Sequence, residues 1–311
     1  MVKVSVPGKV NIMGEHAVVY GKPALLAAID KRLTVTVLDR KDTSGSPKNP
    51  EYAEHILSLV QKDLGFSTVP PMEISIQSDI PSGYHLGSSA AVAVGVASAA
   101  LYFLKHIWNP VRANQIAYES EKMKHGNPSG GDNTICTFGG LVWYRKEFEF
   151  LRSIFQLPFH IDPSLNNFFL IKTGKPKEST KEMIEIVRSK MKDERSKIES
   201  AFVLNEEQTK RITVAIKESD EETLVDAIKI GECTLETMGV VSDSAQKIIR
   251  EIELAGGAAK ILGGGGKKGP VGYLLAYHRD EKAIQAIGAS YGYKVEQVKL
   301  GEEGVQLESR D

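Results

Sequence analysis

The segment Gly83-Tyr84-His85-Leu86-Gly87-Ser88-Ser89-Ala90-Ala91 carries residue types that can bind a phosphate group. Gly83 and Gly87 let the backbone come close to an anion. Ser88 and Ser89 offer hydroxyl groups for helix capping, for phosphate or for a magnesium ion. The spacing matches neither the Gly-Lys-Ser/Thr phosphate loop nor the Gly-x-Gly-x-x-Gly dinucleotide fingerprint. Taken alone, the segment is more typical of a plain helix N-cap, so its surroundings decide between the two interpretations.

The flanking residues predict the elements that position this loop. Met72–Ser78 alternates apolar and polar side chains as a half-buried strand does, and Ala90–Leu104 consists of small and apolar residues. At 15 residues the second segment is too long for a typical strand and shorter than the roughly 20 residues that span a bilayer. We therefore expect a buried helix. A strand, a glycine loop and a helix start place unpaired N–H groups and the positive helix end around an anion.

Polar residues gather in a second glycine-rich segment, Pro7–Gly21, which follows a short strand expected at Lys3–Val6. Lys9, Glu15 and His16 fall within eight residues, in sequence that is otherwise typical of protein core. Singly they are typical of a surface lysine or a turn histidine. Together they indicate a substrate site.

A third segment places two carboxylates near glycine-rich turns. A helical pattern that begins near Pro110 runs to His125 and is followed by Gly126, a typical C-terminal cap. Asn127–Gly131 has the composition of a turn, and Asp132 starts the next segment. Glu121 lies near the end of the helix, where the dipole disfavours a negative charge and a bound cation would offset that cost.

In combination these segments resemble the motifs of the GHMP small-molecule kinase superfamily, in the same order and over nearly the whole chain. The segment Glu15–Gly21 discriminates within the superfamily, because galactokinases share only its Gly-Glu-His start, while homoserine kinases and diphosphomevalonate decarboxylases open differently. It resembles the mevalonate kinase family, as Met238–Ser242 also does. The matching stretches are Pro7–Asn11, Gly14–Gly21, Leu86–Ala91, His125–Asn133 and Lys260–Gly266.

The resemblance implies a role for each matching residue. Asp132 would be the catalytic aspartate that accepts the proton of the substrate hydroxyl, and Lys9 would lie beside it and help to polarise that hydroxyl. Ser89 and Glu121 would be the ligands of a magnesium ion, which also keeps waters and phosphate oxygens. The ATP phosphates would lie on the loop residues Gly83, Gly87, Ser88, Ser89 and Ala90.

The resemblance also implies a substrate pocket. Glu15 and His16 would line it, Tyr144 would contact the substrate, and either Arg145 or Lys146 would pair with its carboxylate. The implied reaction is the ATP- and Mg²⁺-dependent phosphorylation of mevalonate at its 5-hydroxyl, which feeds isoprenoid synthesis. Two alternatives stay open: the same chemistry on another small alcohol, such as phosphomevalonate or a sugar, and a sensor that binds a nucleotide or metabolite without turnover.

Two positions depart from the pattern that the resemblance implies. The superfamily loop usually has the sequence Gly-x-Gly-Leu-Gly-Ser-Ser-Ala, and His85 stands where its middle glycine is expected. If φ is positive there, the cost is about 1 kcal/mol. His85 then either reaches a nucleotide phosphate or is an exposed loop residue. Lys267 and Lys268 follow the last glycine motif, where small residues are usual.

Composition argues against several other classes of function. The 39 basic and 40 acidic side chains give a net charge of −1, which indicates no general attraction to nucleic acids or membranes. Cys136 and Cys233 lie far apart without metal-ligand spacing, as expected for reduced thiols in a cytoplasmic protein. The N-terminus lacks a signal-peptide pattern. The resemblance makes a homodimer the expected assembly.

We expect an α+β chain of two domains, 1–162 and 163–311, divided near Pro158–Asn167. Asp42–Pro47 has the composition of a polar, mobile loop. The resemblance implies a ribosomal-S5-like first domain, a ferredoxin-like second domain and a site in the cleft between them. The helices expected in the second domain are Lys181–Ser200, Asn205–Glu218, Glu221–Met238 and Asp243–Ala255, and the strands are Phe168–Thr173, Ala258–Leu262, Val271–Tyr277 and Tyr293–Leu300.

Overall fold

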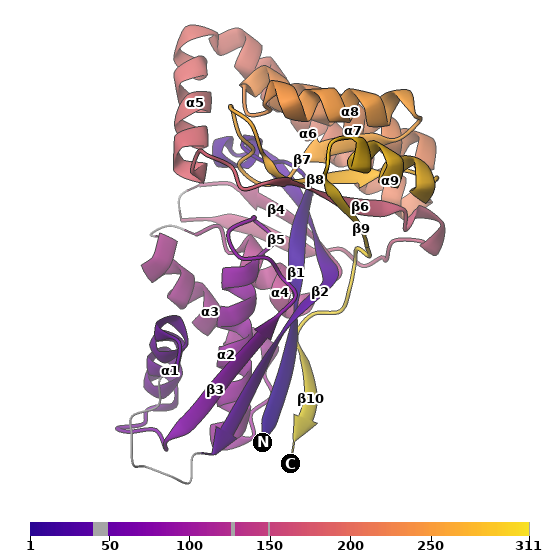
Figure 1. The fold of residues 1–311 in the computed structure, drawn as a ribbon. Coiled ribbons are helices and arrows are strands. Elements are labelled where there is room, and N and C mark those ends of the chain that lie inside the picture. The colour runs from indigo at the N-terminus through magenta and orange to yellow at the C-terminus, as the bar shows by residue number, and fades with distance from the viewer. Residues whose placement is uncertain (40–48, 126–127, 149, 311) are drawn as a thin grey trace.

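The structure is a computed structural model that describes residues 1–39, 49–125, 128–148 and 150–310. The loop expected at Asp42–Pro47 and the expected helix cap Gly126 lie outside these ranges. Within them the chain forms two antiparallel sheets, each covered by helices (Figure 1). The α+β class expected from the sequence is confirmed.

The first sheet is built on a long hairpin of β1 and β2. Its strand order is β10-β1-β2-β4-β5, and β3 also pairs with β2. The register between β1 and β2 shifts after Pro7 and again after Asn11, on either side of Lys9. Such irregularities bend a strand and re-aim its side chains. The strands are β1 (Val2–Met13), β2 (Pro23–Asp39), β3 (Met72–Ser78), β4 (Leu141–Lys146), β5 (Arg152–Gln156) and β10 (Gln306–Arg310).

Helix α2 (Ser88–Lys105) forms the centre of the first core and packs on β1 and β2. A Cβ on Gly95 would lie 2.7 Å from Val35 Cγ2, so small side chains are what allow this close approach. By length and composition the helix could cross a membrane, but 61% of it is buried inside the protein, as in the core helix of a soluble protein. The expected buried helix is therefore confirmed. Around it lie α1 (Glu51–Leu64), α3 (Pro110–His125) and α4 (Gly131–Phe138).

The second sheet has the order β7-β8-β6-β9, with all pairs antiparallel, and carries its own helices (Figure 1). Alternate buried residues of this sheet, such as Ile171 and Leu274, belong to a second core cluster, while those between them, such as Leu170 and Leu275, pack with the first core. The strands are β6 (Phe168–Gly174), β7 (Ala258–Ile261), β8 (Gly272–Tyr277) and β9 (Lys294–Val298). The helices are α5 (Thr180–Asp193), α6 (Arg195–Glu218), α7 (Glu221–Met238), α8 (Asp243–Leu254) and α9 (Glu281–Ser290).

The single helix expected at Lys181–Ser200 is wrong, because α5 ends at Asp193 and α6 begins at Arg195. Between Val187 and Ile198 no residue is buried, so no packed apolar side chain holds one helix through the junction. The helix expected at Asn205–Glu218 is the second part of α6, which begins ten residues earlier, and the remaining elements expected in this half lie within a few residues of their predicted bounds.

The strand β10 returns to the first sheet and pairs with the start of β1, so the two ends of the chain lie side by side (Figure 1). The Ser5 hydroxyl donates to a Glu308 carboxylate oxygen at 2.5 Å, and Arg32 donates to the Gly304 carbonyl at 2.7 Å. The division into 1–162 and 163–311 stays a prediction, and by its pairing β10 belongs to the first sheet.

Candidate functional site

The loop between β3 and α2, residues 79–87, which we call the phosphate loop, lies against β1 beside Lys9. The Lys9 amide donates to the Leu86 carbonyl at 3.0 Å. Gly87 precedes α2 with φ of 79°, and a Cβ there would lie 2.8 Å from Lys9 Cγ, so only glycine fits. No side chain caps α2. Its first N–H groups are therefore left without a capping side chain, as an anion site requires.

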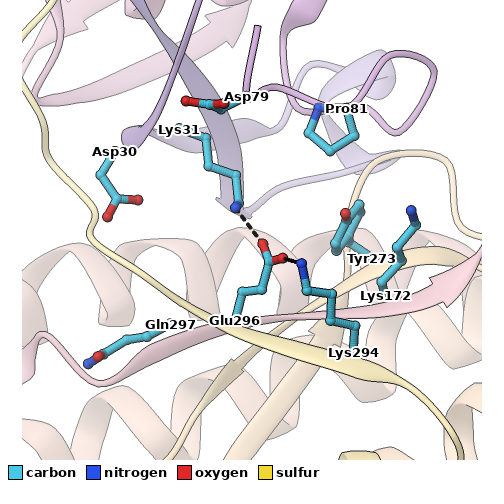
Figure 2. Close-up of a pocket in the computed structure, with 9 residues that line it drawn as sticks. All are labelled: Asp30, Lys31, Asp79, Pro81, Lys172, Tyr273, Lys294, Glu296 and Gln297. Atoms are coloured by element: carbon cyan, nitrogen blue, oxygen red, sulfur yellow. Dashed lines mark hydrogen bonds and ion pairs between the residues drawn. The ribbon is translucent and has the colours of Figure 1, made fainter.

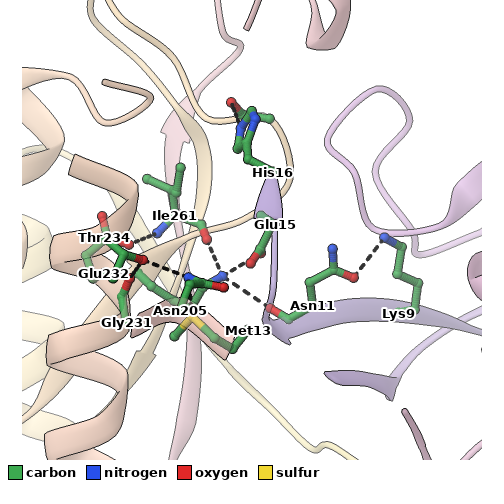
Figure 3. Close-up of polar contacts among 12 residues, drawn as sticks. Lys9, Asn11, Met13, Glu15, His16, Asn205, Gly231, Glu232, Thr234 and Ile261 are labelled. Carbon is green, nitrogen blue, oxygen red and sulfur yellow. Dashed lines mark hydrogen bonds and ion pairs between the residues drawn. The ribbon is translucent and has the colours of Figure 1, made fainter. Parts of the chain in front are cut away.

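The structure brings Lys9 and Asp132 together. Lys9 Nζ lies 3.2 Å from Asp132 Oδ1, with the lysine side chain 6% exposed and the aspartate side chain 43% exposed. Lys9 Nζ also donates to Asn11 Oδ1 at 3.5 Å (Figure 3). Asp132 stands in the first turn of α4, where the helix dipole favours a negative charge. The carboxylate is held from one side by the lysine and is open to a ligand on the other.

The structure also brings Ser89 and Glu121 together. The Ser89 hydroxyl and the Tyr52 hydroxyl donate to the same oxygen of Glu121, at 2.6 and 2.5 Å. Burial and this bond raise the pKa of Tyr52 to about 12, so the phenol stays protonated at neutral pH. Sequence reasoning missed Tyr52, because no local motif on α1 links it to Glu121.

Ser89 and Glu121 fit a magnesium ion in the kind of donor that they offer. A hydroxyl and a carboxylate are hard oxygen ligands, and Mg²⁺ is usually held by one or two carboxylates together with waters and phosphate oxygens. The described residues contain no cluster of three or more His, Cys, Asp or Glu that could hold a metal by itself. A metal at Ser89 and Glu121 would therefore need oxygens from a bound nucleotide.

A cavity of about 490 Å³ joins these groups. Asp132 and Glu121 both line it, and Thr180 at the start of α5 lines it from the second domain. Its volume is within the range of small-ligand sites. All five residues expected to hold ATP phosphates line it, and the phosphate loop and α2 contribute Pro81, Ser82, Gly83, His85, Leu86, Gly87, Ser88, Ser89, Ala90 and Val92.

Glu15 is not among the described residues that line this cavity. Its Oε1 lies 2.5 Å from Lys260 Nζ, and the two side chains are 2% and 0% exposed. Lys260 Nζ also donates to the carbonyls of Asn11 and Ile261, at 3.2 and 2.5 Å, in the cluster around Glu15 (Figure 3). Glu15 thus ties the end of β1 to β7. Its predicted contact with the substrate stays a prediction.

Glu232 of α7 completes this buried cluster. The Ile261 amide donates to Glu232 Oε2 at 3.1 Å. Burial raises the pKa of Glu232 well above its usual value, although the charge of Lys260 acts in the opposite direction. Burial therefore favours the neutral carboxyl over the carboxylate at this position. Sequence reasoning missed it, because in α7 it has the spacing of an ordinary helix residue.

His16 and Tyr144 are buried next to the cavity rather than lining it. His16 Nε2 donates to the Gly264 carbonyl at 3.0 Å, and burial lowers its pKa. Tyr144 lies under the start of α4, because a Cβ on Gly131 would be 3.5 Å from Tyr144 Cδ2. Burial raises the pKa of Tyr144. The substrate contacts expected for both residues stay predictions.

The neighbours of Tyr144 do not decide which cation binds the substrate carboxylate. Arg145 lies 3.8 Å from Glu206 and 3.6 Å from Glu147. The choice between Arg145 and Lys146 stays open.

A second cavity, of about 470 Å³, lies between strands of the two sheets, and Asp79 and Pro81 of the phosphate loop are among its lining residues (Figure 2). Glu296 of β9 binds both Lys31 of β2 and Lys294. Three lysines and three carboxylates line the cavity, so its walls favour neither sign of charge. The lining residues are Asp30, Lys31, Asp79, Pro81, Lys172, Tyr273, Lys294, Glu296 and Gln297.

Comparison with known proteins shows that the chain is similar to one class of enzyme. The model of the GHMP kinases N terminal domain matches residues 51–140. The mevalonate kinase of Archaeoglobus fulgidus is 31% identical over 271 residues, which cover 84% of this chain and 88% of that protein.

Solved structures share the fold. The Methanococcus jannaschii mevalonate kinase has a TM-score of 0.78 at 20% identity, covering 96% of this chain and 98% of its own. The L. major mevalonate kinase in complex with R-mevalonate has a TM-score of 0.76 at 20% identity, covering 97% and 96%.

Proposed function

The chain belongs to the mevalonate kinase family of GHMP kinases, and we propose that it uses Lys9 and Asp132 to phosphorylate mevalonate with ATP. The observation that carries these roles is the 3.2 Å contact between Lys9 Nζ and Asp132 Oδ1. Asp132 also lines the cavity under the phosphate loop, where the terminal phosphate of a bound nucleotide would lie. The product is 5-phosphomevalonate, an intermediate of isoprenoid synthesis.

Asp132 accepts the proton of the 5-hydroxyl as the alcohol oxygen forms its bond to the γ-phosphorus. The bond from that phosphorus to the β–γ bridging oxygen breaks, and ADP leaves with the electron pair. Lys9 fixes the carboxylate and brings positive charge to the reacting oxygen. Proton transfer of this kind contributes about 10²–10⁴-fold, and positioning with charge stabilisation supplies most of the rest.

We propose that Mg²⁺ is the metal of this site and that Ser89 and Glu121 hold it. The support is the 2.6 Å contact between their oxygens beside the phosphate loop. When bound, the ion would neutralise charge on the β- and γ-phosphates. Tyr52, which donates to the same carboxylate oxygen, orients Glu121.

The test is release of ADP in a coupled assay with ATP and magnesium, with mevalonate, phosphomevalonate, galactose and homoserine offered separately. Turnover with mevalonate alone is the expected result. Turnover with another alcohol would contradict the assigned substrate, and ATP binding without any turnover would favour a sensor.

Two further expectations also stay proposals. A cytoplasmic location is compatible with the free thiols of Cys136 and Cys233, and fractionation of cells that produce the protein tests it. A homodimer is expected from the family resemblance, and light scattering after size-exclusion chromatography measures it.

A further inference from the structure

His85 occupies the phosphate loop in a conformation that favours glycine. Its φ is 62°, in the left-handed region, where a side chain with a Cβ is strained. The superfamily pattern has glycine at this position, so the structure holds a histidine against its backbone preference. Strain at a ligand-binding loop is a reason to look for a function of the side chain.

One edge of the His85 ring is packed against Gly263. A Cβ on Gly263 would lie 2.4 Å from His85 Cγ and 2.7 Å from Cδ2, so the carbon edge of the ring lies against this glycine. The residue also lines the cavity under the phosphate loop. Neither ring nitrogen makes a hydrogen bond with any of the residues that the structure describes. A half-buried imidazole therefore borders the cavity with its polar atoms unused.

His85 lines the same cavity as Asp132, and charged groups act on its ring. The ionisable groups that act on it are Lys9, Asp132 and His16. Burial and the Lys9 charge lower the pKa of His85, while Asp132 raises it less. A neutral imidazole carries one N–H, which can donate to an anion without adding a charge. Asp132 and His85 line the same cavity, so the γ-phosphate of a nucleotide bound there shares that cavity with the His85 ring.

We infer that His85 donates a hydrogen bond from its ring to an oxygen of the γ-phosphate of ATP, a contact that the usual glycine cannot make. The inference rests on the proposed function only in that the cavity takes a nucleoside triphosphate. The contact helps to hold the transferred phosphate in line with the substrate hydroxyl, since positioning is the main task of a protein in this reaction.

The test compares two nucleotides that differ in the γ-phosphate. Calorimetry measures the affinities of ADP and of the imido analogue of ATP, both with magnesium. His85→Gly removes the ring and the backbone strain, and His85→Phe keeps an aromatic ring against Gly263 without a donor. In both variants we expect the ratio of analogue affinity to ADP affinity to fall by about 5- to 10-fold, as for one lost hydrogen bond.

His106 supplies a matched control, because it ends the same helix with φ of 54° and packs on Tyr102 away from the cavity. His106→Gly should leave the affinity ratio unchanged. An unchanged ratio in His85→Gly, or equal losses for both nucleotides, would overturn the inference and leave His85 as a packing residue only.

The binding measurement needs no mevalonate, so it fails separately from the proposed function. A selective loss of analogue affinity in a protein that does not phosphorylate mevalonate supports the inference and contradicts the substrate. Normal turnover of mevalonate by the unsubstituted protein, together with an unchanged affinity ratio in His85→Gly, supports the substrate and contradicts the inference about His85. If the unsubstituted protein binds neither nucleotide, both are overturned.

Discussion

Lys260 Nζ lies 2.5 Å from Glu15 Oε1, inside the protein and 245 positions away along the chain. The pair joins the segment after β1 to the strand that precedes the last glycine motif. Because all three ammonium hydrogens are used within the protein, on Glu15 and on the carbonyls of Asn11 and Ile261, Lys260 has no capacity left for a ligand. It therefore acts by holding the two domains in position.

Removing Lys260 should destabilise the fold strongly. Lys260→Met leaves the Glu15 carboxylate buried without its cation, which costs about 3–5 kcal/mol. Urea unfolding measures the loss, and the double variant Glu15→Gln with Lys260→Met should recover part of it. Lys197→Met breaks an exposed pair with Glu194 and should cost nothing measurable. A loss below about 1 kcal/mol for Lys260→Met would contradict the proposed role.

Asp132→Ala should lower kcat by about 10²–10⁴-fold or more with an unchanged melting temperature. The reason is that the proton of the substrate hydroxyl loses its acceptor, while the half-exposed side chain contributes little to the core. Steady-state kinetics and thermal unfolding measure the two effects. Asp193→Ala, at the exposed end of α5, is the control. Near-normal turnover by Asp132→Ala would exclude it as the catalytic base.

Gly87→Ala should lower both stability and activity. The left-handed conformation costs about 1 kcal/mol for alanine, and the new methyl group would displace Lys9, which lies 2.8 Å away. Gly65 has φ of 68°, and a Cβ added there would meet no atom within 4 Å. Gly65→Ala should therefore lose stability through backbone strain and keep its activity. Equal kcat values for the two variants would show that the contact between Gly87 and Lys9 does not matter.

Stability should fall in mild acid because of His16. Burial lowers its pKa in the folded protein below the ordinary value of 6.5, so the unfolded chain binds the additional proton first. The contribution of neutral His16 to the free energy of unfolding should therefore be complete above pH 6.5. It should decrease as the pH falls from 6.5 to the pKa of His16 in the folded protein. His16→Asn, which tolerates the positive φ of 58°, should show a flatter profile. If the free energy of unfolding depends on pH in the same way in His16→Asn and in the unsubstituted protein, His16 is not the cause of the loss of stability.

Glu121→Gln should raise the magnesium concentration needed for half-maximal activity by about tenfold or more, since an amide is a poorer ligand than a carboxylate. Titration of activity with magnesium at saturating ATP measures this. Glu119 lies on the same helix and pairs with Lys122 at the surface, so Glu119→Gln should leave the titration unchanged. If Glu121→Gln titrates like Glu119→Gln, Glu121 does not hold the metal.

Local patterns in the sequence predicted the elements that carry the phosphate loop. The alternation of Met72–Ser78 and the helical pattern ending at His125 have the bounds found in the structure. The family resemblance paired Lys9 with Asp132 and Ser89 with Glu121, and both pairs are in contact. Local periodicity and short motifs were sufficient because each element is specified by neighbouring residues.

The remaining features depend on residues far apart in the chain. Nothing near Glu15 indicates that it is bound to Lys260, and nothing near Tyr52 indicates Glu121. The long strand β2 and the helix α1 were not predicted, because tertiary pairing and packing stabilise them more than a strict local pattern does. A single sequence shows no such contacts.

The pairing of β10 with β1 has a consequence for how the protein can be made and divided. Glu308 is synthesised 303 positions after its partner Ser5, so β1 keeps an open edge while most of the chain leaves the ribosome. An unpaired edge is a site of aggregation. It also means that no single cut through the polypeptide yields two complete folding units, because one of the fragments always takes a strand that the other needs.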